Sequence, residues 1–434
     1  MKKFLTGLFA AGLLLSAAPA LQAAQGVRAE RTTFYELAVH ADLIVKAKLV
    51  EIVDVELEDG VANLDVQLHR FNNSNEAIRR DARLQVTEVL RGDGVFVGEL
   101  DIVSVQQQSF TQYPASLQAG KEALFFLEKR SDGLWDLGGA QRGILSEESG
   151  VGSFTRVEKA VRDVLSYEHQ YVLNEGARHG ALQERFMKEV KLDDSRLSID
   201  SLLDLSMNAE TYAPYFDSYE RFELVNLLWD SVAGSAERLE LITLIGRVQP
   251  DGGREAIIEA IIADPSERTA ARGADALEQY GTAKSCEMLL DRYLEIEAGE
   301  DISKARVITA LGILRPYNKH ADEQMVRARV TDLLRSVLNR DSNSLVLQEA
   351  LLAARDMRYT NNELGPQLTQ LVEDFRQGLV SDVVYKRVIV ALAATRNAQA
   401  KEQLLALKGE FNTRYDKHIE LSILMPFTTL VDFK

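Results

Sequence analysis

Few side chains in this sequence have the spacing of a catalytic or metal-binding motif. The six histidines are scattered over 434 residues: His40, His69, His169, His179, His320 and His418. None has a second histidine at metal-ligand spacing. The sequence contains no H-E-x-x-H, P-loop, nucleophile elbow or dinucleotide-binding glycine motif. A triad or metal centre would have to be assembled by the fold, so we predict no catalytic, metal-binding or cofactor-binding residue and no cofactor.

Acidic side chains crowd the end of one expected strand, at Asp54, Glu56, Glu58 and Asp59. Such carboxylates could bind a hard cation such as Ca²⁺. They lack the Asp-x-Asp-x-Asp-Gly arrangement that places oxygens around calcium. We favour the interpretation that they form a solvated strand edge, which discourages edge-to-edge pairing.

Aromatic residues are concentrated between 208 and 229. They are Tyr212, Tyr215, Phe216, Tyr219, Phe222 and Trp229. One interpretation is a binding groove, because Tyr and Trp combine a large contact area with a polar group. The other, which we favour, is a cap over the open end of a helical core. The possible partner-binding residues are Tyr212, Tyr215, Phe216, Tyr219 and Trp229.

The elements that would position such residues change near residue 150. Before it, apolar and charged residues alternate with a period near two, and Gly-containing turns separate the runs, as is typical of strands. Asp59-Gly60 is a hairpin signal. The expected strands are 43–57, 64–68, 84–90, 100–105, 123–127 and 134–137. Short strands in this number predict a small closed or nearly closed barrel.

The order of these segments carries a resemblance. A short helical lead at 34–40 enters Ala41-Asp42-Leu43-Ile44-Val45, and 86–92, 119–127 and 133–135 follow. Over about a quarter of the chain, this resembles the exported OB-like, netrin-module-like barrels of bacterial envelope proteins. The disulfides of animal netrin modules are absent. Metalloprotease inhibition through a disulfide-tied N-terminus, known in one branch of that superfamily, is therefore not implied.

Helical patterning replaces the strand signal after Gly150 and contains a repeated step. The steps are Thr243-Leu244, Ala276-Leu277, Ala310-Leu311, Ala350-Leu351 and Ala391-Leu392, at intervals of 33, 34, 40 and 41 residues. Ala and Gly would let these helices approach closely, and a second helix follows each across a short loop. The phrases resemble HEAT and armadillo-like repeats, which implies an α-solenoid. A non-repetitive helical domain is the alternative.

The first residues predict export. Lys2 and Lys3 precede an apolar run from Phe4 to Ala20, and small residues suited to cleavage extend to Ala24. The run is too short for a good membrane span, and no later segment approaches the roughly 18 apolar residues that a span needs. We therefore expect a cleaved signal peptide and a periplasmic or secreted protein.

Charge and cysteine content limit the partners and the stabilising chemistry. The chain has 50 Lys and Arg against 66 Asp and Glu, a net charge of −16. Nucleic acid and anionic membrane surfaces are poor partners for it, although the acidity could also serve solubility alone. Cys286 is the single cysteine, so no intrachain disulfide can form, and we expect its thiol to be buried.

These observations together predict an α+β multidomain chain, a small OB-like barrel followed by a HEAT/armadillo-like solenoid. The expected divisions are a signal peptide at 1–24, the barrel at 25–150, a helical linker with degenerate repeats or a cap at 151–235, and the solenoid at 236–434. The expected function is an exported, non-enzymatic binding or scaffold protein of the bacterial cell envelope with a protein or envelope partner. The alternative is an envelope hydrolase with an acidic site, or a regulator of one. The oligomeric state stays open.

Overall fold

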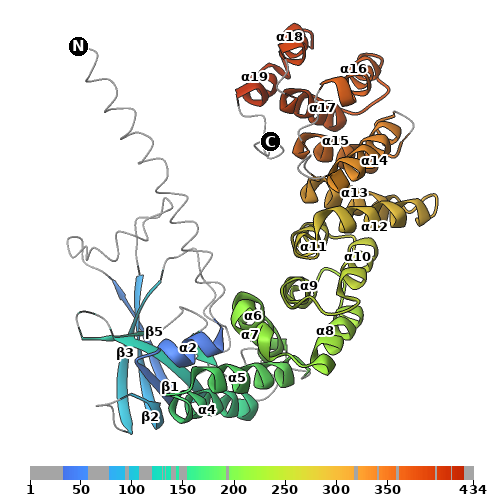
Figure 1. Cartoon of the computed structure of the whole chain (residues 1–434). Coiled ribbons are helices and arrows are strands. Elements are labelled where there is room, and N and C mark those ends of the chain that lie inside the picture. Colours follow the sequence, from blue (N-terminus) through green and yellow to red (C-terminus); the bar gives the residue numbers. More distant parts are fainter. Residues whose placement is uncertain are drawn as a thin grey trace, which may run out of the picture. The chain divides into compact units, whose positions relative to one another are not determined.

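The computed structural model describes two compact units, residues 1–215 and 216–434, which are treated separately below (Figure 1). The described residues are 33–56, 78–92, 97–106, 120–129, 131, 133–137, 143–145, 154–191, 195–316, 321–339, 342–357, 361–395, 398–411 and 413–424. The expected signal peptide, the Asp59-Gly60 hairpin and the strand at 64–68 lie outside these ranges. None of the helices in the described ranges is long and apolar enough to cross a membrane.

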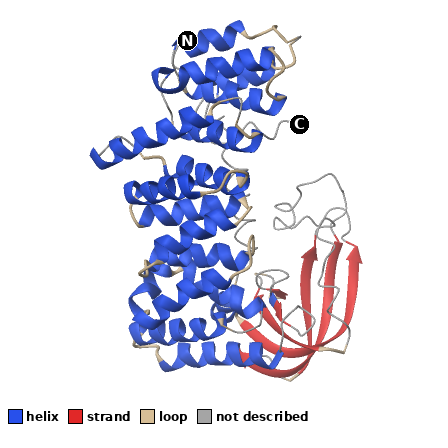
Figure 2. Cartoon of the chain, turned by 90° about the vertical axis from the view of Figure 1, so that its right-hand side faces the viewer, coloured by secondary structure: helices blue, strands red, loops and turns tan. Residues whose placement is uncertain are grey.

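The first unit contains a small, strongly curled sheet that is antiparallel except at one pairing (Figure 2). Its strands are β1 (Leu43–Glu56), β2 (Ile78–Arg91), β3 (Gly98–Gln106), β4 (Glu122–Lys129), β5 (Trp135–Leu137) and β6 (Ile144–Leu145). The order is β1-β2-β3-β5-β4-β6, and β1 also pairs with β4. Only the parallel pair Ile102 and Trp135 joins β3 to β5, so the ring is nearly closed. This confirms a small, barrel-like curled sheet in the N-terminal part of the chain.

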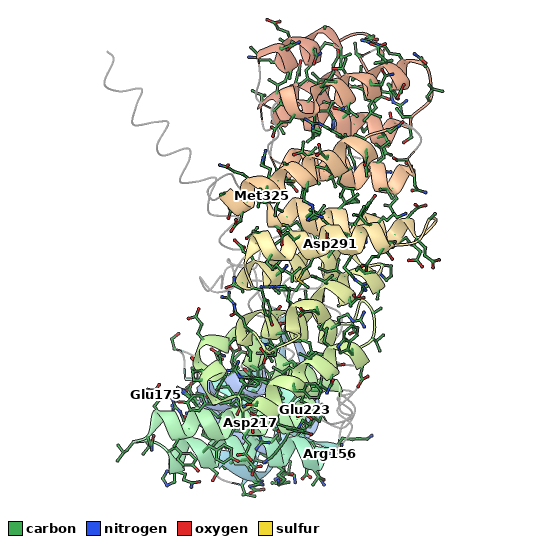
Figure 3. The ribbon with its side chains drawn as sticks, turned by 45° about the vertical axis from the view of Figure 1, so that its right-hand side comes forward. Arg156, Glu175, Asp217, Glu223, Asp291 and Met325 are labelled. Carbon is green, nitrogen blue, oxygen red and sulfur yellow. The ribbon has the colours of Figure 1, made fainter. Side chains whose placement is uncertain are left out.

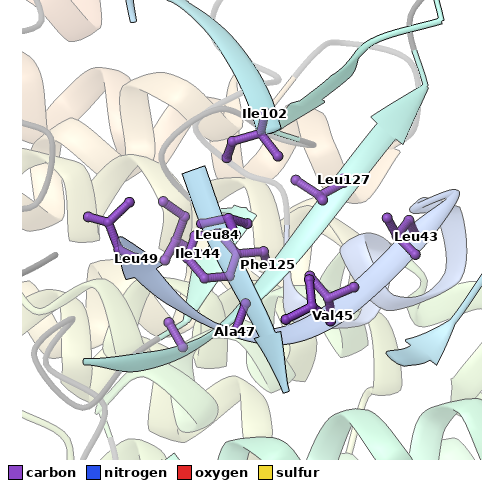
Figure 4. Close-up of a cluster of buried hydrophobic side chains, with 11 residues drawn as sticks. Leu43, Val45, Ala47, Leu49, Leu84, Ile102, Phe125, Leu127 and Ile144 are labelled. Atoms are coloured by element: carbon purple, nitrogen blue, oxygen red, sulfur yellow. The ribbon is translucent and has the colours of Figure 1, made fainter. Parts of the chain in front are cut away.

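Alternation along β1 and β4 builds the interior of the sheet (Figure 4). Alternate residues point to the same face of a strand. The inward set is Leu43, Val45, Ala47, Leu49, Leu84, Val86, Ile102, Ala123, Phe125, Leu127 and Ile144. Ile44 and Phe126, which point the other way, are buried as well. The outer face of β1 and β4 must therefore be covered too.

Helices of the same unit supply that cover. They are α2 (Phe34–His40), α4 (Phe154–Gln170), α5 (Glu175–Val190), α6 (Ser195–Met207), α7 (Ala209–Tyr212) and the 3₁₀ turn η3 (Ala213–Tyr215). Lys46 Nζ of β1 lies 2.9 Å from Glu158 Oε2 of α4. Arg185 of α5 pairs with Asp163 of α4 and with Glu189, at 2.7 and 2.5 Å. Sheet and helices thus form one packed unit.

The second unit is a helical array. Its helices are α8 (Ser218–Asp230), α9 (Ala236–Val248), α10 (Gly253–Ala263), α11 (Glu267–Gln279), α12 (Thr282–Glu295), α13 (Asp301–Leu314), α14 (Ala321–Val337), α15 (Ser344–Asp356), α16 (Asn361–Arg376), α17 (Asp382–Ala394), α18 (Ala398–Ala406) and α19 (Asp416–Leu424). Helices α9, α11, α13, α15 and α17 pack side by side and form what we call the Ala/Gly layer. Helices α8, α10, α12, α14 and α16 form the covering layer. The α+β fold class is therefore confirmed.

The repeated sequence step lies in the Ala/Gly layer, where helices touch through their smallest residues. A Cβ added to Gly246 of α9 would lie 2.6 Å from Ala276 Cβ of α11. A Cβ added to Gly312 of α13 would lie 2.8 Å from Ala353 Cα of α15. Ala310 is fully buried. The helices approach as closely as glycine allows.

A buried carboxylate links three successive helices of this layer. Glu349 of α15 is 3% exposed. Its Oε2 accepts from Thr309 Oγ1 of α13 at 2.9 Å, and its Oε1 accepts from Arg387 of α17 at 3.2 Å. A buried charge is tolerable when it is paired in this way, and here it also fixes the register of α13, α15 and α17.

Four aromatic residues pack together among the last described helices, α16 to α19, which the sequence did not lead us to expect. Phe375 and Tyr385 stack with ring centroids 4.0 Å apart, and Phe411 and Tyr415 meet them edge-on. Tyr415 donates its hydroxyl to Asp382. The hydroxyl of Tyr385 is buried and has no hydrogen-bond partner among the described residues.

Gly312→Ala should lower the free energy of unfolding by about 1 to 2 kcal/mol. The new methyl group meets the Ala353 backbone, which cannot rotate away, so we expect a cost of about 2 to 3 kcal/mol, in the upper part of the range for overpacking. Helix propensity returns about 1 kcal/mol of this, because alanine is the better helix former. Urea unfolding measures the loss, and Lys304→Gln on the same helix is the control, with an expected change of about 0.5 kcal/mol or less. Unchanged stability of Gly312→Ala would show that α13 and α15 have room between them.

Tyr385→Phe should leave stability unchanged or raise it by about 1 kcal/mol, because it removes a buried hydroxyl without a partner. Tyr415→Phe should lower the free energy of unfolding by about 1 to 3 kcal/mol, because it removes a hydrogen bond to a carboxylate. Both substitutions keep the ring, so thermal or urea unfolding of the two variants compares the hydroxyls directly. A loss in Tyr385→Phe as large as in Tyr415→Phe would mean that the Tyr385 hydroxyl is satisfied.

Candidate binding surface

The structure divides the expected aromatic segment into buried and exposed members. Tyr212 is 3% exposed, with its ring edge-on to Phe186 at 5.8 Å and to His179 at 6.0 Å. Tyr215, at the end of the first unit, is partly exposed and lies 6.4 Å from the His179 ring. Phe216, at the start of the second unit, is 5% exposed. Tyr212 and Phe216 therefore act in packing and present almost no surface to a partner.

The remaining members lie on one face of α8 and are exposed. Tyr219 is 68% exposed, Phe222 is 60% exposed and Trp229 is 54% exposed. We call these three residues the α8 stripe. With 3.6 residues per turn, positions 219, 222, 226 and 229 share one side of a helix, and Asn226 is the polar member of this row. The opposite side packs in the array through the buried residues Leu224, Val225 and Leu228.

Local interactions make α8 a well-defined platform. Asp217 caps its N-terminus: Asp217 Oδ1 accepts from Glu220 N at 2.7 Å, and Glu220 Oε2 accepts from Asp217 N at 3.1 Å. This reciprocal capping box satisfies two backbone donors. Arg221 donates to the Val248 carbonyl oxygen at the end of α9, at 2.6 Å. The stripe is thus presented by a capped helix anchored to its neighbour.

Carboxylates border the α8 stripe on one side. Glu223 and Asp230 follow Tyr219 and Asn226 by one turn each, which places them next to the aromatic row. Asp230 is exposed, whereas Glu223 is only partly exposed and its Oε2 atom is buried. Figure 3 labels Glu223 and Asp217. Arg221 is the one cationic residue of α8, and it lies toward the buried side. The exposed face therefore combines aromatic rings with negative charge.

A shallow polar pocket lies at the turn between α9 and α10. Its volume is about 350 Å³. It is lined by Gln249, Pro250, Asp251, Gly252, Arg254, Glu255, Gln279 and Tyr280. Arg254 donates to the Tyr280 carbonyl oxygen, and Gln249 donates to the Gln279 carbonyl oxygen at 2.6 Å. These polar walls tie successive repeats together.

The most deeply buried carboxylates hold the beginning of α2. Thr33 Oγ1 donates to Asp204 Oδ1 at 2.8 Å, and the Phe34 backbone N–H donates to Asp200 Oδ2 at 3.1 Å. Asp200 and Asp204 are one turn apart on α6 and at most 1% exposed. Burial raises the pKa of the Asp204 carboxyl well above its usual value, and the carboxylates of Asp200, Glu36 and Glu189 raise it further. No substrate could reach this pair, so its role is structural.

Other candidate chemical groups stay apart in the described residues. No group of three or more His, Cys, Asp and Glu side chains there could hold a metal ion. The side chains of Asp54 and Glu56, and all of Glu58 and Asp59, lie outside the described residues. Cys286 is buried, as expected, and burial raises the pKa of its thiol to about 12.

Comparisons with known proteins add no functional assignment. No protein-family model matches the chain, and no curated protein matches it. The candidate site therefore rests on its own residues, and the α8 stripe is the feature with the chemistry of a contact surface.

Asp204→Asn should make stability less dependent on pH. Because the pKa of Asp204 is raised in the folded state, the unfolding free energy of the native chain falls as pH rises from about 4 through the folded-state pKa. Asn keeps an oxygen that accepts from Thr33 but cannot ionise, so the variant should lose less stability over that range. Urea unfolding between about pH 4 and pH 8 measures this.

Thr33→Val is the matched control for this pair. It removes the donor to Asp204 but leaves the carboxyl, so the fall in stability with rising pH should persist. An identical pH dependence of Asp204→Asn and the native chain would contradict the assignment of this effect to Asp204.

Proposed function

We propose that this chain is an exported, non-enzymatic binding or scaffold protein of the bacterial cell envelope. In this proposal, it engages a protein or envelope partner through its helical-repeat surface, and the α8 stripe is the point of contact. The observation that carries the proposal is the exposure of three aromatic side chains on one face of an anchored helix. Contiguous exposed apolar surface of this kind marks interaction sites, and Tyr and Trp are enriched among residues that dominate binding energy.

The family-level part of the proposal is a HEAT/armadillo-like array behind a netrin-module-like barrel. Paired helices in two layers, with the Ala-Leu or Thr-Leu step in one of them, support the first. The strand order of the curled sheet and the position of the short helix α2 before β1 support the netrin-module-like barrel. Extended arrays of this type suit large partners because their surface is long and built from similar units.

Export is proposed from the N-terminal sequence alone. The two lysines, the apolar run to Ala20 and the small residues up to Ala24 support a cleaved signal peptide. The mature protein would then act in the periplasm or outside the cell. Because Cys286 is the single cysteine, it cannot form an intrachain disulfide there.

The alternative, an acidic-site hydrolase or a regulator of one, has weaker support. Two-carboxylate hydrolysis needs both groups at the substrate, with one of them able to hold a proton. Asp204, whose pKa is raised, is shielded together with Asp200. Asp251 and Glu255 line the open pocket, but its other walls are occupied with contacts between repeats.

A photo-crosslinking residue in place of Phe222 should capture the partner in the cell that makes this protein. Benzoylphenylalanine keeps an aromatic ring at the position, so the surface is little changed. The same residue in place of Leu294, which is 74% exposed on α12, is the control. We expect a discrete crosslinked species from position 222 that is absent from position 294. Identical patterns at the two positions, or none at either, would contradict the proposed contact.

A further inference from the structure

The spacing of the α8 stripe indicates the shape of what covers it. Tyr219, Phe222, Asn226 and Trp229 are separated by three, four and three residues. Residues at this spacing form the line along which one helix packs against another. An extended strand would instead present every second residue to one side. The complementary shape is a second helix with its own apolar stripe.

The charge around the stripe indicates the chemistry of that helix. Glu223 and Asp230 lie along one border, Asp217 is exposed at the N-terminal end, and Arg221 is engaged with backbone carbonyl oxygens. A partner with cations beside its apolar stripe would place them opposite these carboxylates. Complementary charge of this kind speeds association and selects among partners.

A second copy of this chain fits the surface less well. Each copy carries the same acidic border and a net charge of −16. In an antiparallel pair of stripes, Glu223 and Asp230 would face the same residues of the other copy. Like charges in that position oppose association.

We propose that the α8 stripe is a docking site for a cationic amphipathic helix of a partner protein. This inference rests on the proposed binding function and adds the partner's secondary structure and charge. The aromatic rings supply the apolar contact. Asn226 offers a hydrogen-bonding side chain within the same row. The exposed carboxylate of Asp230 favours lysine- or arginine-bearing helices, and the partly exposed Glu223 adds negative charge beside the same row.

The test uses the mature full-length chain and two labelled synthetic peptides. Each peptide has about three heptads with Leu at the a and d positions. One has Lys at the flanking e and g positions, and the other has Glu there. Fluorescence anisotropy at about 0.15 M salt measures binding. We expect the lysine peptide to bind at least about 10-fold more tightly than the glutamate peptide, with a preference that weakens at higher salt.

Variants at exposed positions locate the binding. Phe222→Ser should weaken binding of the lysine peptide at least about 10-fold, because an aromatic anchor is lost without a change in charge. Asp230→Lys should reduce the preference for the lysine peptide, because it replaces the exposed carboxylate of the border with a cation. The matched controls are Leu294→Ser and Asp291→Lys on α12, the latter labelled in Figure 3, and each should change affinity by less than about 2-fold.

Four results would overturn the inference. Equal binding of both peptides would remove the charge selection, and unchanged affinity in Phe222→Ser would place the peptide elsewhere on the acidic surface. Self-association of the free chain that disappears in Phe222→Ser would make a second copy the occupant. Crosslinking at position 222 does not depend on partner charge, so a captured partner together with failure of the lysine peptide would overturn this inference alone.

Discussion

The close approach of helices in the Ala/Gly layer is the constraint on which the second unit depends. At Gly246 and Gly312, a neighbouring alanine occupies the space that a Cβ would need. The short distance between neighbouring helices of the Ala/Gly layer sets the spacing between successive repeats, because each helix of the covering layer packs on a helix of this layer. It also brings Thr309, Glu349 and Arg387 within hydrogen-bonding distance across three helices. Packing density in the layer and the polar link across it are therefore consequences of the same small residues.

Aromatic side chains gather in two parts of the second unit and behave differently in each. Phe375 of α16, Tyr385 of α17, and Phe411 and Tyr415 between α18 and α19 turn toward one another, and their rings join these helices. In α8, the first helix of the unit, the aromatic residues of the stripe point away from the array. The same residue types thus fill the space between helices in one place and form an exposed apolar row in the other. A cap and a contact surface are distinguished by burial, which composition does not report.

Much of the array and of the sheet could be predicted because the signals are local. Alternation marked β1 and β4, and the Ala-Leu step marked the layer whose helices touch, since both depend on periods of a few residues. A cap was expected around residues 208–229, but the aromatic cluster among α16 to α19 was not predicted. Its members are spread over separate helices and turns, so no window of sequence contains them.

Long-range polar contacts were equally hidden. Thr33 and Asp204 are 171 residues apart, and nothing in either segment indicates the other. The α8 stripe was predicted only as part of a mixed aromatic segment. Leu224, Val225 and Leu228 make one side of α8 apolar and the aromatic rings make the other side apolar, so the helix lacks a single amphipathic period that would reveal which side is exposed.

An exposed apolar row such as the α8 stripe favours self-association, and the acidic residues beside it oppose this. Three large aromatic side chains on one helix face would favour pairing of two copies. Glu223 and Asp230 oppose such pairing because each copy presents the same charge along the same border. In the proposed docking of a cationic helix, the sign of that interaction reverses, so the same carboxylates would oppose self-association and favour one class of partner. Without its acidic border, the aromatic row would bind apolar surfaces of any charge. In the proposed docking, the border restricts it to cationic helices.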